Sequence, residues 1–477
     1  MADWLTSEPG CSKVLKVFWF ALARTFVLLT RLQWAAFFTE ETTVMHISPE
    51  ARNNAQNLLD FIDVSPSPWH AVACLEGELL KQQFVRLQEN ERWALRVGGR
   101  YYVIRGDSSL IAFVIGHEAL PETGIHMLGA HTDSPGLRLK PRAPHATDNM
   151  ARLGVEIYGS PILATFTDRD LSLAGRLSVR SGSCLNSRLI RFPRPLVRLP
   201  NLAIHMNRAV NEEGLKFNKQ TELPLLLGTL ASAFSPQEQF LALLAEEAGV
   251  EEGEIVTWEL QVYDTHKGTF WGAHQEFVAD SQIDNLASCH AGMTALLAAQ
   301  SPAATCLCGF FDHEEVGSES AKGAQGSFLS DVTERIARAV GLDWEGYRQS
   351  LANSFLISVD MAHAFQPNFP SAYEPQHHVQ VNGGPVIKTN VNQRYATDSC
   401  SEAQFINLCE RVNVPYQQYA HRTDLGCGST IGPIIGSRLG VRTVDVGNPM
   451  WAMHSIRESA GVVDHTSLIH VLTAFFS

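Results

Sequence analysis

The chain has 477 residues, of which 45% are hydrophobic and 18% are charged. This length and balance are typical of a folded protein with a sizeable core, built as two domains or as one large α/β domain with an insertion. The formal net charge of −13 and the absence of a dense Lys/Arg run argue against a nucleic-acid-binding protein, which needs a basic surface for the phosphates.

Residues 1–44 differ from the rest of the sequence, because four cations interrupt an apolar stretch over 13–38. No uncharged run approaches the roughly 20 residues that span a bilayer. The cations fall on one face of a helix, so one interpretation is a membrane-surface helix. We favour a second one, in which Met45 is the true start and 1–44 is a doubtful extension, because a self-sufficient globular pattern begins just after Met45. No targeting signal then remains, and membrane association is not expected.

The first elements after Met45 predict the beginning of an α/β domain, over 45–136. Apolar spacing predicts a helix over 49–64, which a Ser-Pro turn closes. Two strands follow at 101–106 and 109–116, joined by a turn. A third, "GIHMLGAH", ends in polar residues and a Pro-Gly turn.

The pattern of predicted elements changes over 137–275, where short strand-like segments alternate with Gly, Pro and Ser turns. One helix is expected near 237–248. We interpret this segment as an inserted β-rich domain.

From 276 to 477 the α/β alternation returns. The predicted elements are helices at 286–299, 329–340, 401–412 and 429–439, a final helix after His454, and strands at 305–311, 354–360 and 441–447. Alternating strands and helices predict a mixed, largely parallel sheet with helices on both faces. The catalytic domain is therefore expected to be discontinuous, formed by 45–136 and 276–477.

Candidate metal ligands recur where these strands end. They are His131 and Asp133, Glu314 and Glu315, Asp360, and His454. Ligands of open α/β sheets bind outside the carboxyl ends of the strands. Asp284 stands instead at the start of the 286–299 helix, where Ser281 and Asp284 also fit a capping box. Any one of these residues has a structural explanation, and their recurrence at successive strand ends favours a site.

Two imidazoles and several carboxylates without a thiolate suit zinc, manganese or cobalt. Two divalent ions bound by three carboxylates keep one uncompensated positive charge, which would lower the pKa of a bound water. The three carboxylates would be those of Asp284, Glu315 and Asp360. Two ions about 3.5–4 Å apart need a bridging carboxylate, for which Asp284 is the natural candidate.

The adjacent glutamates are expected to have different roles. Neighbouring side chains of an extended chain point in opposite directions, so Glu314 and Glu315 should not bind the same ion. We assign Glu315 as a ligand and Glu314 as the general base. Asp133, two residues after His131, is placed to accept the other imidazole N–H of that histidine.

The sequence resembles the aspartyl aminopeptidase family of dinuclear zinc metallopeptidases (family M18), and its length is closest to that of bacterial members. The resemblance runs in order from about Asn54 to Phe476. It is carried by the motifs "GAHTDSPGLRLKP", "DRDLSLAGR", "NLAIHMNR", "QIDNLASCHAG", "DHEEVGSESAKGAQG", "SVDMAHAFQPNF", "NGGPVIKTNVNQRYATD", "GCGSTIGPI" and "AMHSIRE".

The resemblance implies two Zn²⁺ per subunit, with manganese or cobalt as substitutes. One ion would be bound by His131, Asp284 and Asp360, and the other by Asp284, Glu315 and His454. It also implies Glu314 as the base and Asp133 as the acid that orients a histidine. It further implies a homo-oligomer, usually a dodecamer, in which the inserted domain over 137–275 mediates the dimer contacts. His205 would reach the active site of a neighbouring subunit. Lys388 would line the specificity pocket and pair with a substrate carboxylate.

Gly428 and Ser429 lie in the Gly-rich stretch that opens the predicted 429–439 helix. One interpretation is that its backbone N–H groups bind an anionic group of the substrate. The other is a tight turn with a helix cap at Ser429.

These features predict a cytoplasmic metalloaminopeptidase that releases N-terminal residues, acidic ones preferred, from peptide substrates. The alternatives are an aminopeptidase that prefers neutral residues, or a carboxypeptidase or deacylase with the same metal centre. A non-catalytic assembly protein with a structural metal would lack the base or a ligand, and all of these residues are present. Nine scattered cysteines without a C-x-x-C pair favour a reducing compartment.

Overall fold

A computed structural model of the chain describes residues 47–230 and 235–477, and Pro49–Ser477 form one compact unit. The expected extension at 1–44, with its candidate membrane-surface helix, lies outside the described residues. Within the described ranges, no helix is long and apolar enough to cross a membrane.

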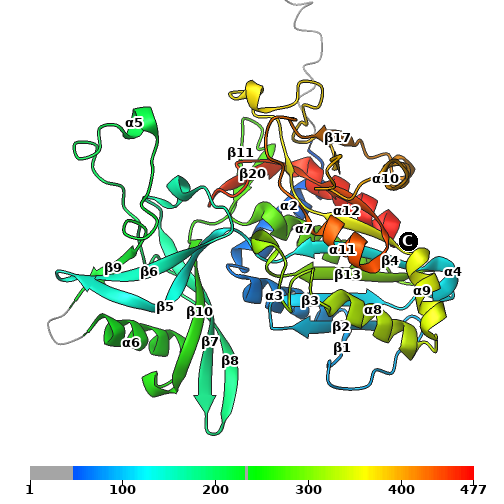
Figure 1. The fold of residues 1–477 in the computed structure, drawn as a ribbon, viewed down its shortest axis with the longest axis horizontal. Coiled ribbons are helices and arrows are strands. Elements are labelled where there is room, and N and C mark those ends of the chain that lie inside the picture. The colour runs from blue at the N-terminus through cyan, green and yellow to red at the C-terminus, as the bar shows by residue number, and fades with distance from the viewer. Residues whose placement is uncertain (1–46, 231–234) are drawn as a thin grey trace, which may run out of the picture. The chain divides into compact units, whose positions relative to one another are not determined.

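The helices alternate with strands along most of the chain (Figure 1). They are α2 (Pro49–Asp63), α3 (Pro68–Lys81), α4 (Leu120–Thr123), α5 (Val210–Glu213), α6 (Pro236–Ala248), α7 (Ile283–Ala298), α8 (Phe328–Ala339), α9 (Trp344–Ala352), α10 (Ser399–Arg411), α11 (Ile431–Leu439) and α12 (Val462–Phe475). The predicted helices are confirmed. The sequence patterns missed α3, which begins beyond the Ser-Pro turn with Ser67 as its N-cap, and α9.

The central sheet has nine strands in the order β1-β2-β3-β13-β4-β14-β18-β16-β17. Their bounds are β1 (Val85–Arg86), β2 (Arg100–Arg105), β3 (Ser109–Val114), β4 (Ile125–His131), β13 (Thr305–Phe311), β14 (Phe355–Val359), β16 (Val386–Thr389), β17 (Gln417–Ala420) and β18 (Arg442–Gly447). The four neighbours β13, β4, β14 and β18 run parallel, whereas β3 and β16 pair antiparallel to this group. The predicted mixed, largely parallel sheet is confirmed.

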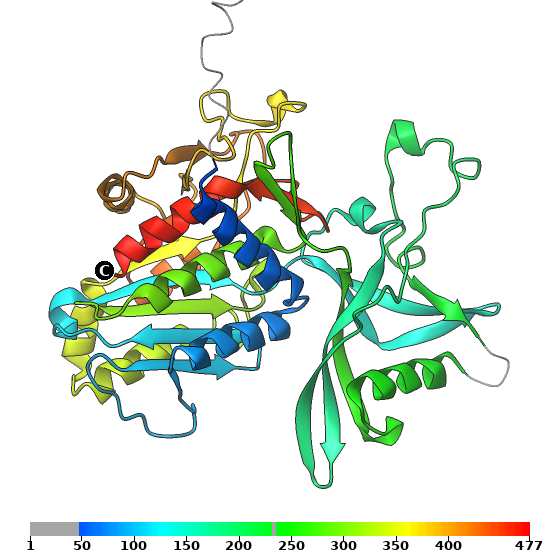
Figure 2. The same ribbon diagram turned by 180° about the vertical axis from the view of Figure 1, so that it is seen from behind.

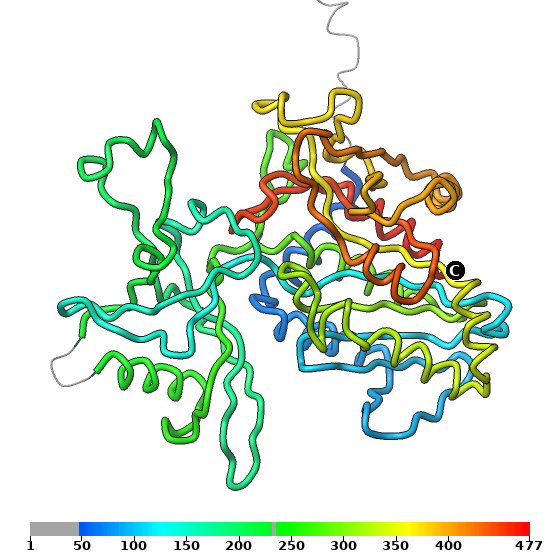
Figure 3. The backbone as a smooth tube through the Cα atoms, viewed as in Figure 1, coloured from blue at the N-terminus to red at the C-terminus, as the bar shows by residue number. Residues whose placement is uncertain are grey.

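Helices cover both faces of this sheet. One face packs against α8, α9 and α11, which Figure 1 shows in front of the strands. Seen from behind, α2, α7 and α12 cover the other face (Figure 2). The chain trace in Figure 3 shows strands from the first and second parts of the chain side by side in this sheet. Because both faces are covered, β13 is buried along its whole length, which explains its continuous apolar sequence.

A second, antiparallel sheet contains strands in the order β8-β7-β10-β5-β6-β9. They are β5 (Gly136–Thr147), β6 (Met150–Tyr158), β7 (Leu171–Ser181), β8 (Cys184–Arg191), β9 (Leu225–Thr229) and β10 (Ile255–Asp264). Helix α6 packs on this sheet through Phe240 and Leu244, which belong to a separate apolar core. Strand-rich structure over most of 137–275 is therefore present as expected, although its boundaries as a domain stay a prediction.

A third, five-stranded sheet has the order β11-β12-β20-β19-β15. Its strands are β11 (Thr269–Trp271), β12 (Phe277–Asp280), β15 (Ala362–His363), β19 (Pro449–Trp451) and β20 (Glu458–Gly461). Residues 269–271, which fall within the expected insertion 137–275, pair through β11 with β12 of the later segment.

A buried histidine pair joins α7 and α12 on the second face. His290 Nδ1 lies 2.8 Å from His465 Nε2, and His465 is 2% exposed. Burial lowers the pKa of His290 to about 4, which the charge of Glu78 opposes. Burial and the nearby His290 hold the pKa of His465 well below its usual range. Both imidazoles are therefore neutral in the folded protein near neutral pH.

This pair predicts a pH-dependent loss of stability. The unfolded chain takes up these protons near pH 6.5, whereas the folded chain does so only at lower pH. The stabilising contribution is therefore complete above about pH 6.5 and decreases as the pH falls, by up to about 1.4 kcal/mol per pH unit for each histidine. The free energy of unfolding, measured between pH 7 and 4, should decrease less steeply in His465→Gln than in the wild type. The control is His470→Gln, because the side chain of His470 is 42% exposed. An equal decrease of the unfolding free energy with pH in His465→Gln, His470→Gln and the wild type would contradict the prediction.

Candidate metal centre

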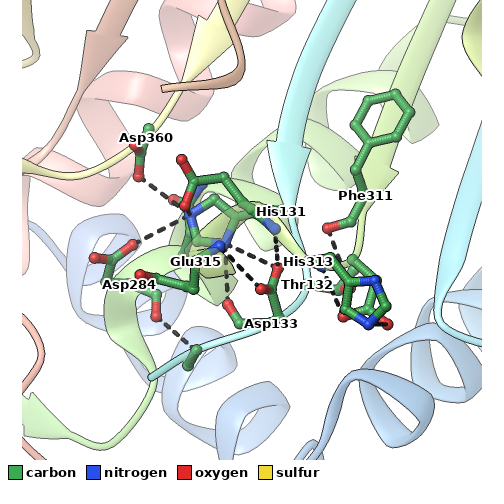
Figure 4. Close-up of polar contacts among 12 residues, drawn as sticks. His131, Thr132, Asp133, Asp284, Phe311, His313, Glu315 and Asp360 are labelled. Atoms are coloured by element: carbon green, nitrogen blue, oxygen red, sulfur yellow. Dashed lines mark hydrogen bonds and ion pairs between the residues drawn. The ribbon is translucent and has the colours of Figure 1, made fainter. Parts of the chain in front are cut away.

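The candidate ligands meet at one edge of the central sheet. His131 is the last residue of β4, Asp360 follows β14, and Glu314 and Glu315 follow β13. Since β13, β4 and β14 are parallel neighbours, their carboxyl ends lie together. Asp284 enters from the start of α7, and His454 from the turn between β19 and β20. Figure 4 shows His131 facing Asp284 and Asp360.

Two ligand groups share Asp284. In the first, His131 Nε2 lies 3.5 Å from Asp284 Oδ1 and 3.4 Å from Asp360 Oδ1. In the second, His454 Nε2 lies 3.5 Å from Asp284 Oδ2 and 3.5 Å from Glu315 Oε2. Each oxygen of the Asp284 carboxylate therefore faces a different histidine, as a bridging ligand requires.

These distances fit zinc better than direct contact between the side chains. They exceed the usual 2.7–3.2 Å of an N–H···O hydrogen bond. Zn–N and Zn–O bonds of about 2.0–2.2 Å around a tetrahedral ion put neighbouring ligand atoms about 3.4 Å apart. Asp284 Oδ1 is buried and has no hydrogen-bond partner among the described residues. The donor set, two imidazoles and three carboxylates, is one that zinc accepts.

Glu314 lies close to both groups and belongs to a third group of possible ligands. Its Oε2 is 3.9 Å from His131 Nε2, and His131, Glu314 and Glu315 form a third group whose ligand atoms lie within 4.8 Å of one another. Burial raises the pKa of the Glu314 carboxyl to about 8; His131 opposes the rise, and the charges of Asp360, Asp133 and Asp284 add to it. Such a group can both accept and release a proton near neutral pH.

The two glutamates do not lie in extended chain, so the conformation on which we based their separation is wrong. They begin a single 3₁₀ turn, Glu314–Val316, after His313 with a φ of 68°. Successive side chains of a 3₁₀ turn diverge by about 120°, yet one carboxylate oxygen of Glu314 and one of Glu315 lie within 4.8 Å of each other. The backbone N–H groups of Glu314 and Glu315 donate to the two oxygens of Asp133, each at 3.1 Å.

Asp133 therefore has a wider role than expected. The acceptor nearest to His131 Nδ1 is the carbonyl oxygen of Asp133, at 2.9 Å, and the carboxylate Oδ1 is 3.5 Å away. The carboxylate accepts a 2.6 Å hydrogen bond from the hydroxyl of Tyr158, at the end of β6. It thus fixes the turn that carries Glu314, while the carbonyl fixes the tautomer of His131.

Asp284 is held through its backbone. Helical geometry does not begin until after Asn285, and the predicted capping box is not formed, because Gln282 precedes α7 with a φ of 57° and no side-chain cap. Ser134 Oγ donates to the carbonyl of Asp284 at 2.6 Å, and the N–H of Asp284 donates to Glu458 Oε2 at 3.0 Å.

His454 has a φ of 68° and three contacts that fix it. Its N–H donates to Glu458 Oε1 at 2.7 Å, and its carbonyl accepts the N–H of Ile162 at 2.9 Å. Its Nδ1 lies 3.1 Å from the carbonyl of Ser160, which places the proton on Nδ1 and leaves Nε2 as the ligand atom. No sequence pattern pointed to Tyr158 or Ser160, and Ser134 and Glu458 were quoted only as parts of motifs.

Lys388 is 2% exposed, near the end of β16. Its Nζ donates to the carbonyl oxygens of Asp360, at 2.9 Å, and Met361, at 3.2 Å. It also lies 3.8 Å from Asp360 Oδ2. The structure thus brings Lys388 to the first ligand group, where two of its three N–H donors are used.

Three predicted residues have no contact with the ligand groups among the described residues. His205 is exposed in the turn 203–207. Gly428 is in an exposed loop, and Ser429 Oγ donates to the carbonyl of Arg394. Helix α11 starts at Ile431 after Thr430, so the alternative of a cap at Ser429 is wrong. The same loop, with 389–398, lines a cleft of about 720 Å³.

The chain is similar to known proteins over most of its length. A family model described as Aminopeptidase I zinc metalloprotease (M18) matches residues 61–476. The Probable M18 family aminopeptidase 2 of Azotobacter vinelandii is 46% identical over 426 residues, which cover 88% of this chain and 97% of that protein. A chain in the cryo-EM structure of the Ape4 and Nbr1 complex superposes with a TM-score of 0.87 and 37% identity, covering 90% of this chain and 86% of that one.

The S. cerevisiae mApe1 dodecamer has a TM-score of 0.78 and 28% identity, covering 89% of this chain and 96% of its own. The resemblance inferred from the motifs is therefore confirmed. The chain belongs to the M18 family of zinc metallopeptidases and is an aminopeptidase.

Proposed function

We propose that this aminopeptidase holds two metal ions per subunit, one between His131, Asp284 and Asp360 and one between Asp284, Glu315 and His454, with Glu314 as the general base. The observation that carries the proposal is that the two oxygens of Asp284 face two different histidines at 3.5 Å, while Glu314 is farther from His131, at 3.9 Å. Zinc bound there would supply an acidified water and polarise the substrate carbonyl.

The protein's own groups would carry the proton. Glu314, whose Oε2 lies 3.9 Å from His131 Nε2, accepts a proton from the attacking water and passes it to the leaving amine. Asp133 keeps Glu314 in place through the backbone of the 3₁₀ turn and through Tyr158. Carbonyl oxygens face Nδ1 of His131 and of His454, so both histidines would present Nε2 to the metal ions.

We propose a preference for N-terminal Asp and Glu, through Lys388. Two of its three N–H donors bind backbone carbonyls, so one remains for a substrate carboxylate. The ammonium lies beside Asp360, at the rim of the first ligand group. The cleft lined by parts of 389–398 and 420–427 begins at Thr389, next to Lys388, and would receive the rest of the peptide. Gly428 and Ser429 directly follow the second of these segments and would lie at the border of the cleft.

Lys388→Met is expected to lower kcat/KM for aspartyl and glutamyl amides by about 10–100-fold, the size of one charged hydrogen bond. Alanyl and leucyl amides should change by less than about threefold. The neutral substrates are the control, because a disturbed Asp360 would affect every substrate equally. Equal losses on all four amides would contradict a specificity role for Lys388.

We propose that the protein assembles as a homo-oligomer, as a dodecamer like the S. cerevisiae mApe1 neighbour, with the six-stranded sheet at the dimer contact. The turn that carries His205 supports this, because its neighbours Leu202, Ile204 and Met206 are 63%, 47% and 74% exposed. Clustered exposed apolar side chains favour a protein contact. His205 would then complete the site of the adjoining subunit. Light scattering of the purified protein tests the subunit number.

We also propose a cytoplasmic location. All eight cysteines in the described residues are free thiols, and Cys289, Cys306, Cys308 and Cys409 are buried in the core. This usage fits a reducing compartment.

The decisive experiment compares aspartyl, glutamyl, alanyl and leucyl amides, with their N-acetylated forms, in the presence and absence of zinc. Metal-dependent release from the free amines, fastest for the acidic residues, is expected. Faster release of neutral residues would overturn the acidic preference and keep the metal mechanism. Equal cleavage of the acetylated forms would contradict aminopeptidase action by this centre.

A further inference from the structure

A buried carboxylate lies directly behind the proposed metal centre. Glu458, the first residue of β20, is 1% exposed. Its Oε2 accepts the backbone N–H of Asp284 at 3.0 Å, and its Oε1 accepts the backbone N–H of His454 at 2.7 Å. One rigid, planar group thus connects two residues that are 170 positions apart in the sequence.

Neither of these two backbone segments is held by regular secondary structure. Asp284 has non-helical dihedral angles at the start of α7, and His454 has a φ of 68°. A non-glycine residue at positive φ persists only where its surroundings fix it, since the conformation costs about 1–3 kcal/mol. Glu458 satisfies the N–H group of both residues, and it sets the distance between the two segments.

Asp284 and His454 provide two of the three side chains in the second ligand group, whereas only Asp284 belongs to the first. We propose that Glu458 is a positioning residue that sets the affinity of the second metal site, formed by Asp284, Glu315 and His454. The inference rests on the proposed two-ion centre and adds a residue that binds neither metal nor substrate.

The chain offers a matched control. Asp464, in the first turn of α12, is also a fully buried carboxylate that accepts two backbone N–H groups, from Asn382 at 2.6 Å and from Gly384 at 2.8 Å. Neither donor is a candidate ligand. Replacing either carboxylate by an amide keeps the shape, but puts an NH₂ group against one backbone N–H. A general loss of stability should therefore appear in both Glu458→Gln and Asp464→Asn, whereas weaker zinc binding should appear only in Glu458→Gln.

The experiment is a titration of metal-free protein with zinc against a fluorescent chelator, for wild type, Glu458→Gln and Asp464→Asn. The wild type is expected to bind two ions per subunit. Glu458→Gln should bind the second ion about 10–100-fold more weakly, the usual effect of losing an outer hydrogen-bond partner, and the first ion with little change. Asp464→Asn should bind both ions like the wild type.

A second-site affinity in Glu458→Gln within about twofold of wild type would overturn the inference while the two-ion centre stands, since losing such a partner usually costs far more. An equal loss of affinity for the second ion in Asp464→Asn would also overturn the inference, because it would show that any such buried substitution weakens metal binding. Binding of a single ion by the wild type would overturn the two-ion centre and the inference with it.

Amide hydrogen exchange in metal-free wild-type protein tests the inference even if Glu458→Gln does not fold. The N–H groups of Asp284 and His454 should stay protected without metal, because Glu458 holds both of them. Exchange as fast as in the exposed loop 423–429 would overturn the inference.

Discussion

Glu314→Gln is expected to lower kcat by about 10²–10⁴-fold and to leave the zinc content unchanged. The amide has nearly the shape of the carboxyl but cannot accept the water's proton. Because the Glu314 N–H, not its side chain, is held by Asp133, the 3₁₀ turn should survive the substitution. The measurement is steady-state hydrolysis of an aspartyl amide, with metal per subunit determined on the same sample.

Glu319→Gln is the matched control, because Glu319 is exposed five residues farther along the same loop. It should retain wild-type kcat. Loss of zinc from Glu314→Gln would identify Glu314 as a ligand, as in the third group with His131 and Glu315, and would contradict its role as the base.

Asp284→Asn is expected to weaken the binding of both ions, each by more than about 100-fold, because a direct ligand contributes more than an outer partner does. The substitution removes the negative charge that both groups share and leaves one oxygen to face two histidines. Activity should fall to background at limiting zinc. Metal content after dialysis and activity during zinc titration check this.

Asp280→Asn provides the control for Asp284→Asn. Asp280 is a buried acid four residues earlier that belongs to none of the ligand groups. Its metal binding should be that of the wild type. Retention of one ion at full affinity by Asp284→Asn would contradict a bridging role.

Much of the site could be predicted, because it follows from local pattern and sheet topology. His131, Asp360 and the two glutamates each end an apolar strand, and parallel neighbours place such ends together. The composition of this set then indicates zinc. Burial on both faces made β13 and β14 easy to recognise as strands.

The contacts that hold the ligands could not be predicted, because they are long-range and mostly involve backbone groups. The bond from Tyr158 to Asp133 joins different sheets, and the bonds of Glu458 reach backbone N–H groups whose direction depends on positive φ angles and a non-helical turn. The conformation of Glu314 and Glu315 was misjudged for the same reason, since the sequence does not reveal that Asp133 accepts both of their N–H groups.

The end of strand β6 and the residues that follow it contact both halves of the proposed metal centre. Within five residues, Tyr158 binds Asp133, Ser160 accepts His454 Nδ1, and Ile162 binds the carbonyl of His454. The antiparallel sheet therefore supplies part of the scaffold of the catalytic apparatus and is not a detachable module. A shortened chain that joins 45–136 directly to 276–477 would lose the anchor of the base and of one histidine together. Engineering that aims at a minimal peptidase from this sequence must graft 158–162 along with the ligands.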